Sequence, residues 1–529
     1  MIALLIALCR RGYEISADLA KDIDSRTENR TRTTLLALQF IALLAGFFSA
    51  AAILVFALAQ VWLALLYWRT KNTPGQGQEL PNAWSGPWPT VLIQLPIYNE
   101  QYVVERLLKC IAQMDYPKDK LTIQLLDDSS DETGAIAAKT IALLKTQGMN
   151  IDHIRRPDRK GFKAGALDYG LKLNGAEFVA IFDADFLPRP DFVKQVIAYF
   201  ADPKVGMVQT RWEHLNADYS LITRMMAFAI DNHFSVEHGG RQASDSFINF
   251  NGTGGMWRRK TIEEAGGWKS DTLTEDLDLS FRSQIMGWKF IFAENITSPS
   301  ELPVQMSAVR SQQYRWTKGA AETGRKTLSN LWNSSASLST KIVGSFHMLN
   351  SFIFLFLFLF ALSTAALPFL GFTHFMAIAM ALNLLITSAM LATLITYWIS
   401  QRAGDFIGQS KSAVDVLYTT VTFLALATGL CAHCSRAVLQ GLFGQATPFV
   451  RTPKLNVTDE NRQIKGKQAY NITAIPPVVF IELALTLLFI GLIIISFGHQ
   501  ASVFIGIYIF YAIAFGIVSV LSVREVIAG

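Results

Sequence analysis

The sequence predicts an α/β domain joined to an α-helical transmembrane domain. Short β-rich runs alternate with helical stretches between residues 88 and 325, which is the pattern of a doubly wound parallel sheet. Long apolar stretches flank this region, at residues 34–68 and again beyond residue 340. The 529-residue chain is 51% hydrophobic and 17% charged, which is too apolar for an ordinary soluble protein.

The chain opens with a segment, residues 1–33, that mixes six basic with five acidic residues. Its apolar start is too short to span a membrane and follows no charge, so we do not expect a signal peptide. Residues 34–68 would form a helix about 50 Å long, whereas the bilayer core needs about 30 Å. A hairpin of two spans would need about 40 residues. We therefore expect one tilted transmembrane helix that continues beyond the bilayer.

Residues 69–86 contain several prolines and glycines and are expected to form a linker. The α/β domain then covers residues 88–325. Its strands are expected at residues 91–95, 121–126, 178–182 and 205–209, with helices between them that include 100–114 and 163–173. Ligands of such sheets bind at the carboxyl ends of the strands.

Residues 326–529 are expected to form a membrane domain. The apolar runs that could span are residues 342–367, 374–398, 475–497 and 502–522. Another apolar helix, 414–437, precedes a loop with five basic residues, 451–474. Basic loops stay cytoplasmic, so we expect the helix 414–437 to lie along the inner face of the membrane. The α/β domain is then cytoplasmic. The chain would be a multi-pass protein of the cell (inner or plasma) membrane. The six basic residues before the first span run against this topology.

Charge and cysteine content exclude several classes of protein. Lys and Arg number 47 against 42 Asp and Glu, and no dense basic run occurs, so we expect no nucleic-acid partner. The four cysteines do not form a disulfide framework. Cys431 and Cys434 flank a histidine, but they lie in an apolar segment without a second ligand pair, which argues against a metal or redox site.

Acidic residues follow two of the expected strands. Asp183 and Asp185 come directly after residues 178–182, where carboxylates suit a hard divalent cation that also binds a diphosphate. Asp128 follows an earlier strand and is placed to meet a nucleotide. The alternatives are a solvated turn at Asp183 and a helix cap around Asp128.

Two further segments could complete such a site. Residues 155–166 are basic and contain glycines, so Lys163 could meet phosphate, although a solvated basic turn is an equal alternative. Thr-Glu-Asp-Leu-Asp at residues 274–278 offers Glu275 and Asp276, and we assign Asp276 as a general base. The alternative there is a helix N-terminus capped by Thr274.

An aromatic and basic pentad, Gln-Gln-Tyr-Arg-Trp, occupies residues 312–316. Trp316 could stack on a pyranose ring, while Gln312, Gln313 and Arg315 could bond hydroxyls or phosphate. The alternative is an amphipathic helix beside the membrane. Together with the acidic motifs, the pentad indicates sugar transfer from a nucleotide sugar.

These motifs resemble the processive family 2 glycosyltransferases, which include cellulose, hyaluronan and chitin synthases. The likeness is strongest to the plant cellulose-synthase-like A and C families, over about residues 90–330. It is carried by Phe-Asn-Gly-Thr-Gly-Gly-Met-Trp-Arg (250–258), Glu-Ala-Gly-Gly-Trp (264–268), Thr-Glu-Asp-Leu-Asp-Leu (274–279) and the pentad 312–316.

The resemblance implies a GT-A fold with a mixed sheet, an inverting single displacement and a Mg²⁺ or Mn²⁺ ion. It implies that Asp128 contacts the nucleotide base, that Asp183 and Asp185 hold diphosphate and metal, and that Asp276 is the base. Lys163 and Glu275 would join the nucleotide-sugar site. Gln312, Gln313, Arg315 and Trp316 would form the acceptor end at the mouth of a channel.

A loop at residues 445–460 resembles the gating loop of bacterial cellulose synthase, which covers the bound nucleotide. The matching residues are Phe449, Arg451, Thr452 and Lys454. A valine usually stands in place of Arg451, so the match is incomplete there, although an arginine near a diphosphate is chemically reasonable.

We therefore expect a synthase that polymerises a β-linked, β-1,4 hexose chain and extrudes it across the bilayer. Its donor would be UDP-glucose or GDP-mannose, of which we favour UDP-glucose. One alternative is a non-processive transferase that adds single sugars to a lipid or small acceptor. Another is a non-catalytic membrane transport or scaffold protein. The sequence does not indicate an oligomeric state.

Overall fold

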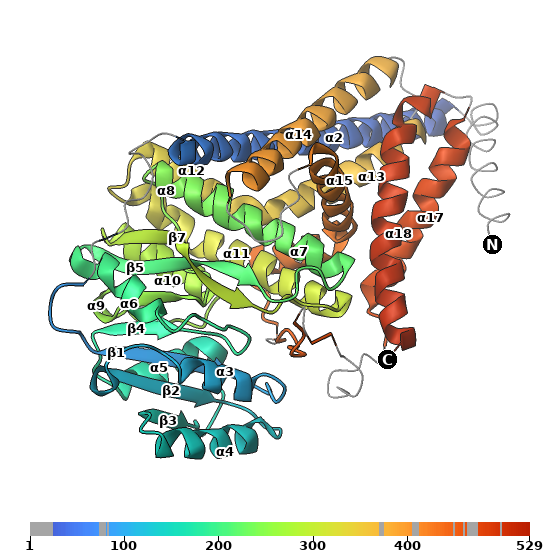
Figure 1. Cartoon of the computed structure of the whole chain (residues 1–529). Coiled ribbons are helices and arrows are strands. Elements are labelled where there is room, and N and C mark those ends of the chain that lie inside the picture. Colours follow the sequence, from blue (N-terminus) through green and yellow to red (C-terminus); the bar gives the residue numbers. More distant parts are fainter. Residues whose placement is uncertain are drawn as a thin grey trace.

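A computed structural model of the chain describes residues 25–72, 81, 84–369, 375–404, 412–447, 450–458, 461–462, 474–497 and 500–528. Within these residues an α/β domain lies against a group of long helices (Figure 1). The expectations for residues 1–24 and for Phe449 lie outside the described residues.

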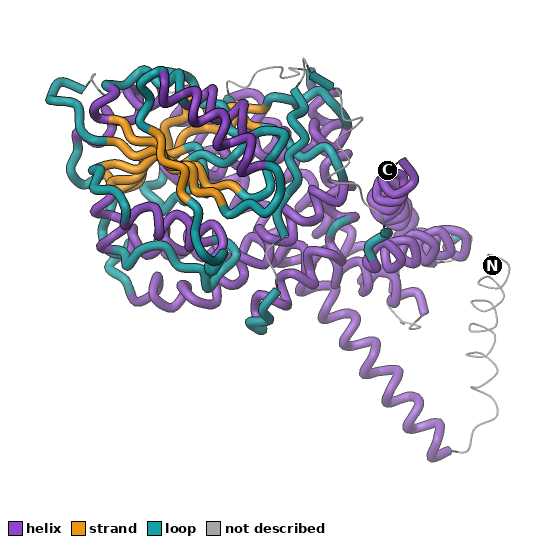
Figure 2. Tube along the Cα trace, turned by 90° about the horizontal axis from the view of Figure 1, so that it is seen from below, coloured by secondary structure: helices purple, strands orange, loops and turns teal. Residues whose placement is uncertain are grey.

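The α/β domain is built on one seven-stranded sheet with the order β3-β2-β1-β4-β6-β5-β7. Figure 2 shows the strands gathered in a single twisted sheet with helices on either side. The strands are β1 (Val91–Ile97), β2 (Leu121–Asp127), β3 (Ile151–Ile154), β4 (Phe178–Ile181), β5 (Val205–His214), β6 (Gly255–Arg258) and β7 (Lys289–Ser300). β6 runs antiparallel to both of its neighbours, so the sheet is mixed and not purely parallel.

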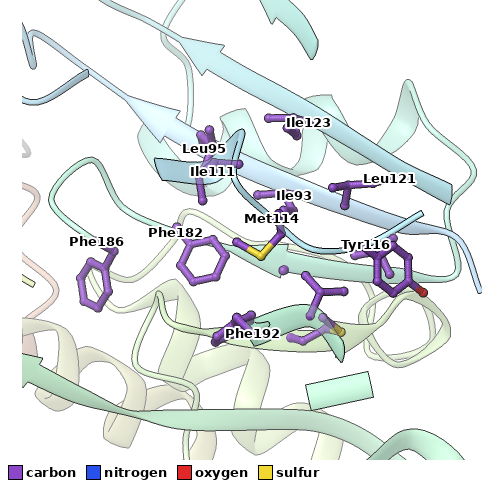
Figure 3. Close-up of a cluster of buried hydrophobic side chains, with 14 of the residues drawn as sticks. Ile93, Leu95, Ile111, Met114, Tyr116, Leu121, Ile123, Phe182, Phe186 and Phe192 are labelled. Atoms are coloured by element: carbon purple, nitrogen blue, oxygen red, sulfur yellow. The ribbon is translucent and has the colours of Figure 1, made fainter. Parts of the chain in front are cut away.

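The central strands are buried because helices cover both faces of the sheet. β1 and β2 consist almost wholly of buried residues, as expected for parallel strands with two covered faces. Figure 3 shows one side of this core, where Ile93, Leu95 and Ile111 pack near Phe182. The Phe182 ring meets Phe192 edge to face, with 4.9 Å between the centroids. This packing holds the strand ends, and the polar residues that follow them, in register.

The helices of this domain are α3 (Val104–Ile111), α4 (Thr133–Thr146), α5 (Phe162–Lys172), α6 (Phe192–Ile197), α7 (Leu221–Asn232), α8 (Gly240–Ala243), α9 (Arg259–Glu264), α10 (Glu275–Ile285) and α11 (Met306–Asn333). A π-helix, His233–Gly239, joins α7 to α8. Single π turns inside helices are frequent at functional sites, because they shift the side chains that follow.

The remaining helices are α2 (Ser25–Asn72), α12 (Leu338–Leu349), α13 (Ile353–Ala366), α14 (Phe375–Ala403), α15 (Ala413–Gly429), α16 (Cys431–Leu442), α17 (Pro477–Ser496) and α18 (Ile505–Ala528). Within the described ranges, five stretches are long and apolar enough to cross a membrane: Leu36–Asn72, Leu338–Ala366, Met376–Ala403, Pro477–Ser496 and Ser502–Ile527. The chain is therefore a membrane protein. α17 and α18 lie side by side (Figure 1).

The apolar run expected as one helix over residues 414–437 forms two helices. α15 and α16 meet at Leu430 with a bend of 54°. α15 packs along α18, and Gly429 makes the contact possible, since a Cβ there would lie 2.3 Å from the Ala514 carbonyl oxygen. The placement of this pair along the inner face stays a prediction.

α11 ties the α/β domain to the membrane helices. The Arg310 guanidinium donates to both carboxylate oxygens of Glu482 in α17, at 2.8 and 2.6 Å, and both side chains are buried. Arg310 Nε also donates to Ser522 Oγ in α18 at 3.2 Å. Glu525 of α18 accepts the backbone N–H groups of Met306 and Ser307 at the start of α11.

We expect Arg310→Met to lower the free energy of unfolding by about 3–5 kcal/mol, because it leaves a buried carboxylate without its partner. The double variant Arg310→Met/Glu482→Met should recover most of the loss. Melting of the detergent-purified protein compares the two variants. A double variant that melts no higher than Arg310→Met would contradict this account of the pair.

Candidate functional site

One cavity lies where the carboxyl ends of the parallel strands meet α10, α11 and the segment 450–458. Sequence-predicted residues that line it are Asp128, Lys163, Asp183, Asp185, Glu275, Asp276, Gln312, Arg315, Trp316, Arg451, Thr452 and Lys454. Gln313 is half-buried on α11 and is not part of this lining. The structure thus gathers groups that are up to about 330 residues apart in the chain.

Asp183 and Asp185 project from the end of β4, and a lysine meets each of them. Lys163 Nζ donates to Asp183 Oδ1 at 2.6 Å. Lys454 Nζ donates to Asp185 Oδ2 at 2.6 Å from the segment 450–458. The Asp183 backbone N–H donates to Thr253 Oγ1 at 2.9 Å, which fixes the turn after the strand.

The two lysines remain charged in this setting. Burial alone would lower the pKa of Lys163, but Asp183 and Glu275 outweigh it and raise the pKa above its ordinary value. Burial likewise opposes the charge on Lys454, and Asp185 raises its pKa. Each carboxylate is therefore neutralised by a protein cation.

The carboxylates fit a divalent cation that shares its coordination with phosphate. Among the described residues, no group of three or more His, Cys, Asp or Glu side chains is arranged to hold a metal by itself. Mg²⁺ sites commonly use only one or two carboxylates and complete their shell with phosphate oxygens and water. Asp183 and Asp185 match that pattern.

Asp276 stands at the first turn of α10, beside Glu275. Its Oδ1 accepts the Leu277 N–H at 2.8 Å, which orients the carboxylate. Burial and the charge of Glu275 raise the pKa of Asp276 to about 7, against the opposing effect of Lys163. A carboxyl group that titrates near neutral pH suits general-base chemistry.

Gly252 allows the loop before β6 to approach this carboxylate. Its φ is +81°, and a Cβ at this position would lie 3.0 Å from Asp276 Oδ2 and 3.4 Å from Lys163 Nζ. The Gly252 carbonyl accepts from Lys163 Nζ at 3.0 Å. The backbone thus closes one side of the space between the lysine and Asp276 without a side chain.

The start of α10 is set by α11 and not by a local cap. The Thr274 side chain accepts no capping hydrogen bond and instead meets Thr323 Oγ1 at 3.2 Å. The Leu273 N–H donates to Glu322 Oε2 at 2.8 Å. Gly319 permits the close approach, since a Cβ there would lie 2.8 Å from the Thr274 backbone nitrogen.

The pentad on α11 forms the other end of the cavity. Gln312 is 8% exposed, and its Oε1 has no hydrogen-bond partner within the described part of the chain. Arg315 Nη2 donates to Thr452 Oγ1 at 2.7 Å. Trp316 packs against a large buried apolar cluster, and α11, which carries it, packs along α16. This end of the cavity therefore adjoins the membrane helices.

Asp128 lines the cavity, but its carboxylate is already engaged. Arg156 donates to both of its oxygens, from Nε at 3.0 Å and from Nη2. Nearby, the Arg159 guanidinium lies 3.3 Å from the centroid of the Tyr98 ring. These flat groups give this end of the cavity a planar wall, which suits a nucleobase.

Two acidic residues that line the cavity were not predicted from the sequence. Glu100 forms an ion pair with Arg451, with 2.9 Å between Oε1 and Nη1, and burial raises its pKa to about 8. Glu301 accepts the Leu455 N–H at 2.8 Å. Glu100 follows β1 and Glu301 follows β7. Asp183 was predicted because it follows a strand, and the same reasoning could therefore have found both glutamates.

Residues 89–319 match the model of the glycosyltransferase like family 2. This region of the chain is a family 2 glycosyltransferase domain. Its mixed sheet is that of the GT-A fold, as the resemblance implied.

Two of the curated relatives that the chain matches are plant enzymes. A probable glucomannan 4-beta-mannosyltransferase 4 of Oryza sativa subsp. japonica is 40% identical over 295 residues, which cover 53% of this chain and 52% of the relative. A probable glucomannan 4-beta-mannosyltransferase 15 of Arabidopsis thaliana is 39% identical over 273 residues, 51% of this chain and 50% of the relative. The chain thus spans about half the length of the curated relatives it matches.

Among solved structures, the mannosyltransferase PcManGT from Pyrobaculum calidifontis, in complex with GDP-Man and Mn²⁺, is similar. It is 20% identical with a TM-score of 0.48, and the likeness covers 75% of this chain and all of that one.

Gly252→Ala should lower the free energy of unfolding by about 1–2 kcal/mol through its positive φ, and should also disturb Asp276. Gly287→Ala is the matched control, because Gly287 has a φ of +96° but nothing within 4 Å of its Cβ position. Both variants should melt earlier, while only Gly252→Ala should lose glycosyl transfer. Equal transfer rates would show that the Gly252 contact does not matter.

Proposed function

We propose that this protein is a membrane-embedded glycosyltransferase that adds β-1,4-linked mannosyl units from GDP-mannose to a growing mannan or glucomannan chain. One observation carries the proposal: a single cavity joins a pair of carboxylates, a buried acid with a pKa near 7 and a tryptophan beside membrane helices. Because the similar plant enzymes are named glucomannan 4-beta-mannosyltransferases, we propose mannose as the donor sugar in place of the glucose that the sequence analysis favoured.

The donor end would bind the nucleotide diphosphate. Asp183 and Asp185 would hold a divalent cation, Mg²⁺ or Mn²⁺, which neutralises the diphosphate when bound. Lys163 and Lys454, which pair with these carboxylates at 2.6 Å, would donate to phosphate oxygens once the donor binds. Asp128, held by Arg156, would face the base.

The acceptor end would supply the nucleophile. Asp276 takes the proton of the acceptor hydroxyl. The oxygen of that hydroxyl bonds to the anomeric carbon of the donor sugar as the bond between this carbon and the diphosphate breaks. This is a single displacement that inverts the anomeric centre, from the α-linked donor to a β-linked product. Trp316 would stack on the acceptor ring, and Gln312 Oε1 would accept from a sugar hydroxyl.

The membrane setting favours a processive enzyme that extrudes its product. Trp316 lies on α11, which packs along α16, so a chain that grows past the indole would reach the helices of the membrane domain at once. Since Arg451 and Lys454 reach the donor site, the segment 450–458 must lie on the same side as the α/β domain. We place both in the cytoplasm, beneath the cell membrane, because the loop 451–474 carries five basic residues.

Purified protein with Mg²⁺ or Mn²⁺ should release GDP from GDP-mannose at least about tenfold faster than UDP from UDP-glucose, a difference within the range that a specific site achieves. The product should be a polymer that an endo-β-1,4-mannanase degrades. Faster release of UDP would overturn the donor assignment. A single added mannose would favour the non-processive alternative.

Asp276→Asn should lower kcat by about 10²- to 10⁴-fold, since the amide cannot accept the proton, while binding of GDP-mannose is retained. Asp271→Asn is the control, because Asp271 is exposed, pairs with Lys326 and lies outside the cavity. Unchanged polymer formation by Asp276→Asn would remove the base assignment and reopen the transport or scaffold alternative.

The rate should fall below about pH 7. The raised pKa of Asp276 means that the carboxyl is protonated below that value and cannot act as a base. We expect kcat/KM to rise about tenfold per pH unit between about pH 5 and 7 and then level off. A profile that is flat through this interval would show that no group with this pKa limits the reaction.

A further inference from the structure

A second cavity, of about 260 Å³, lies between α2, the π-helix, α8 and α12. It shares no described lining residue with the catalytic cavity. One wall is apolar and is formed by Phe56, Leu63, Ile342, Val343 and Phe346. The rest of the lining includes charged and polar groups from the π-helix and its neighbours. An apolar space with a polar end fits an amphiphilic molecule.

Three polar atoms of this cavity are buried and have no hydrogen-bond partner within the described residues: Arg241 Nη2, Gln60 Oε1 and His347 Nε2. Arg241 is only 1% exposed, and its Nε donates to the Glu237 carbonyl at 2.7 Å. A buried polar atom without a partner is destabilising, because it has given up its hydrogen bonds to water. Several of them around one cavity indicate a bound molecule that supplies the missing partners.

Part of the cavity lining is exposed on helices that could span a membrane. Trp62 and Ile342 both line the cavity and are each 42% exposed. They belong to α2 and α12, which form parts of two candidate spans. Leu58 and Leu65 extend the exposed apolar surface along α2. An occupant with acyl chains could enter from the lipid phase without crossing water.

The charges at the polar end select the headgroup. The Glu237 carboxylate already accepts from His233 Nδ1 at 2.8 Å and from Gln60 Nε2 at 3.2 Å. Arg241 Nη2 lies 3.7 Å from Glu237 Oε2, an ion pair without a hydrogen bond, and Gln60 Oε1 is a neutral acceptor; within the described residues neither atom has a hydrogen-bond partner. A phosphate fits the first, and an N–H donor fits the second.

From this geometry we infer that the cavity binds one glycerophospholipid with an aminoethyl headgroup. Its phosphate accepts from Arg241, and its ammonium donates to Gln60 Oε1. Its acyl chains lie against Phe56 and Phe346 and leave past Trp62. This site is independent of the sugar donor and would stand if the proposed function failed.

The full chain, purified in detergent, can be tested by native mass spectrometry with phosphatidylethanolamine, phosphatidylcholine and phosphatidylglycerol, and with inorganic phosphate as a competitor. We expect one phosphatidylethanolamine per chain, bound about tenfold more tightly than phosphatidylcholine, whose headgroup has no N–H to donate. Equal retention of the three lipids, or displacement by inorganic phosphate, would overturn the inference.

Point variants test whether the lipid binds in this cavity. Ala59→Phe fills the cavity from α2, and Ser339→Trp blocks it from the exposed start of α12, so the test survives if one variant fails to fold. Each should weaken binding by about tenfold or more, because the lipid loses its contacts. Leu58→Phe is the control, since Leu58 is exposed on the same turn but is not part of the lining. Equal loss in Leu58→Phe, or no loss in the other two, would place the lipid elsewhere.

Discussion

The placement of α11 is the constraint on which the rest of the structure depends. The buried ion pair between Arg310 and Glu482 holds its first turns against α17. Further along the same helix, Glu322 and Thr323 set the start of α10 and hence the position of Asp276. Buried charges tolerate few alternative geometries, because a misplaced partner leaves a charge uncompensated. One helix therefore fixes both the position of Asp276 and the contact between the α/β domain and the candidate membrane helices.

Sequence reasoning succeeded where a signal is local. Short, continuous apolar runs between helical stretches predicted β1, β2, β4 and β5, because strands buried on both faces need continuous apolar sequence. Acidic residues after strand ends predicted the location of Asp183 and Asp185, since parallel strands bring their carboxyl ends to one edge of the sheet. The pentad predicted the far end of the cavity by composition alone.

The parts that sequence reasoning missed depend on partners distant in the chain. β6 spans four residues and gains its strand geometry only between β4 and β5. Thr274 looked like a helix cap, yet its hydroxyl meets Thr323, because Gly319 lets α11 come close. The engagement of Asp185 by Lys454 joins residues 269 positions apart. Local propensity contains no information about such contacts.

The lysine partners of Asp183 and Asp185 also bear on the order in which ligands bind. While Lys163 and Lys454 remain paired, a lone divalent ion must displace a protein cation from each carboxylate and gains little free energy. In the proposed reaction, the diphosphate would draw the lysines to its own oxygens, free the carboxylates and add its own negative charges to the site. Binding of the ion and of the nucleotide would then be thermodynamically coupled, and each would raise the affinity of the site for the other.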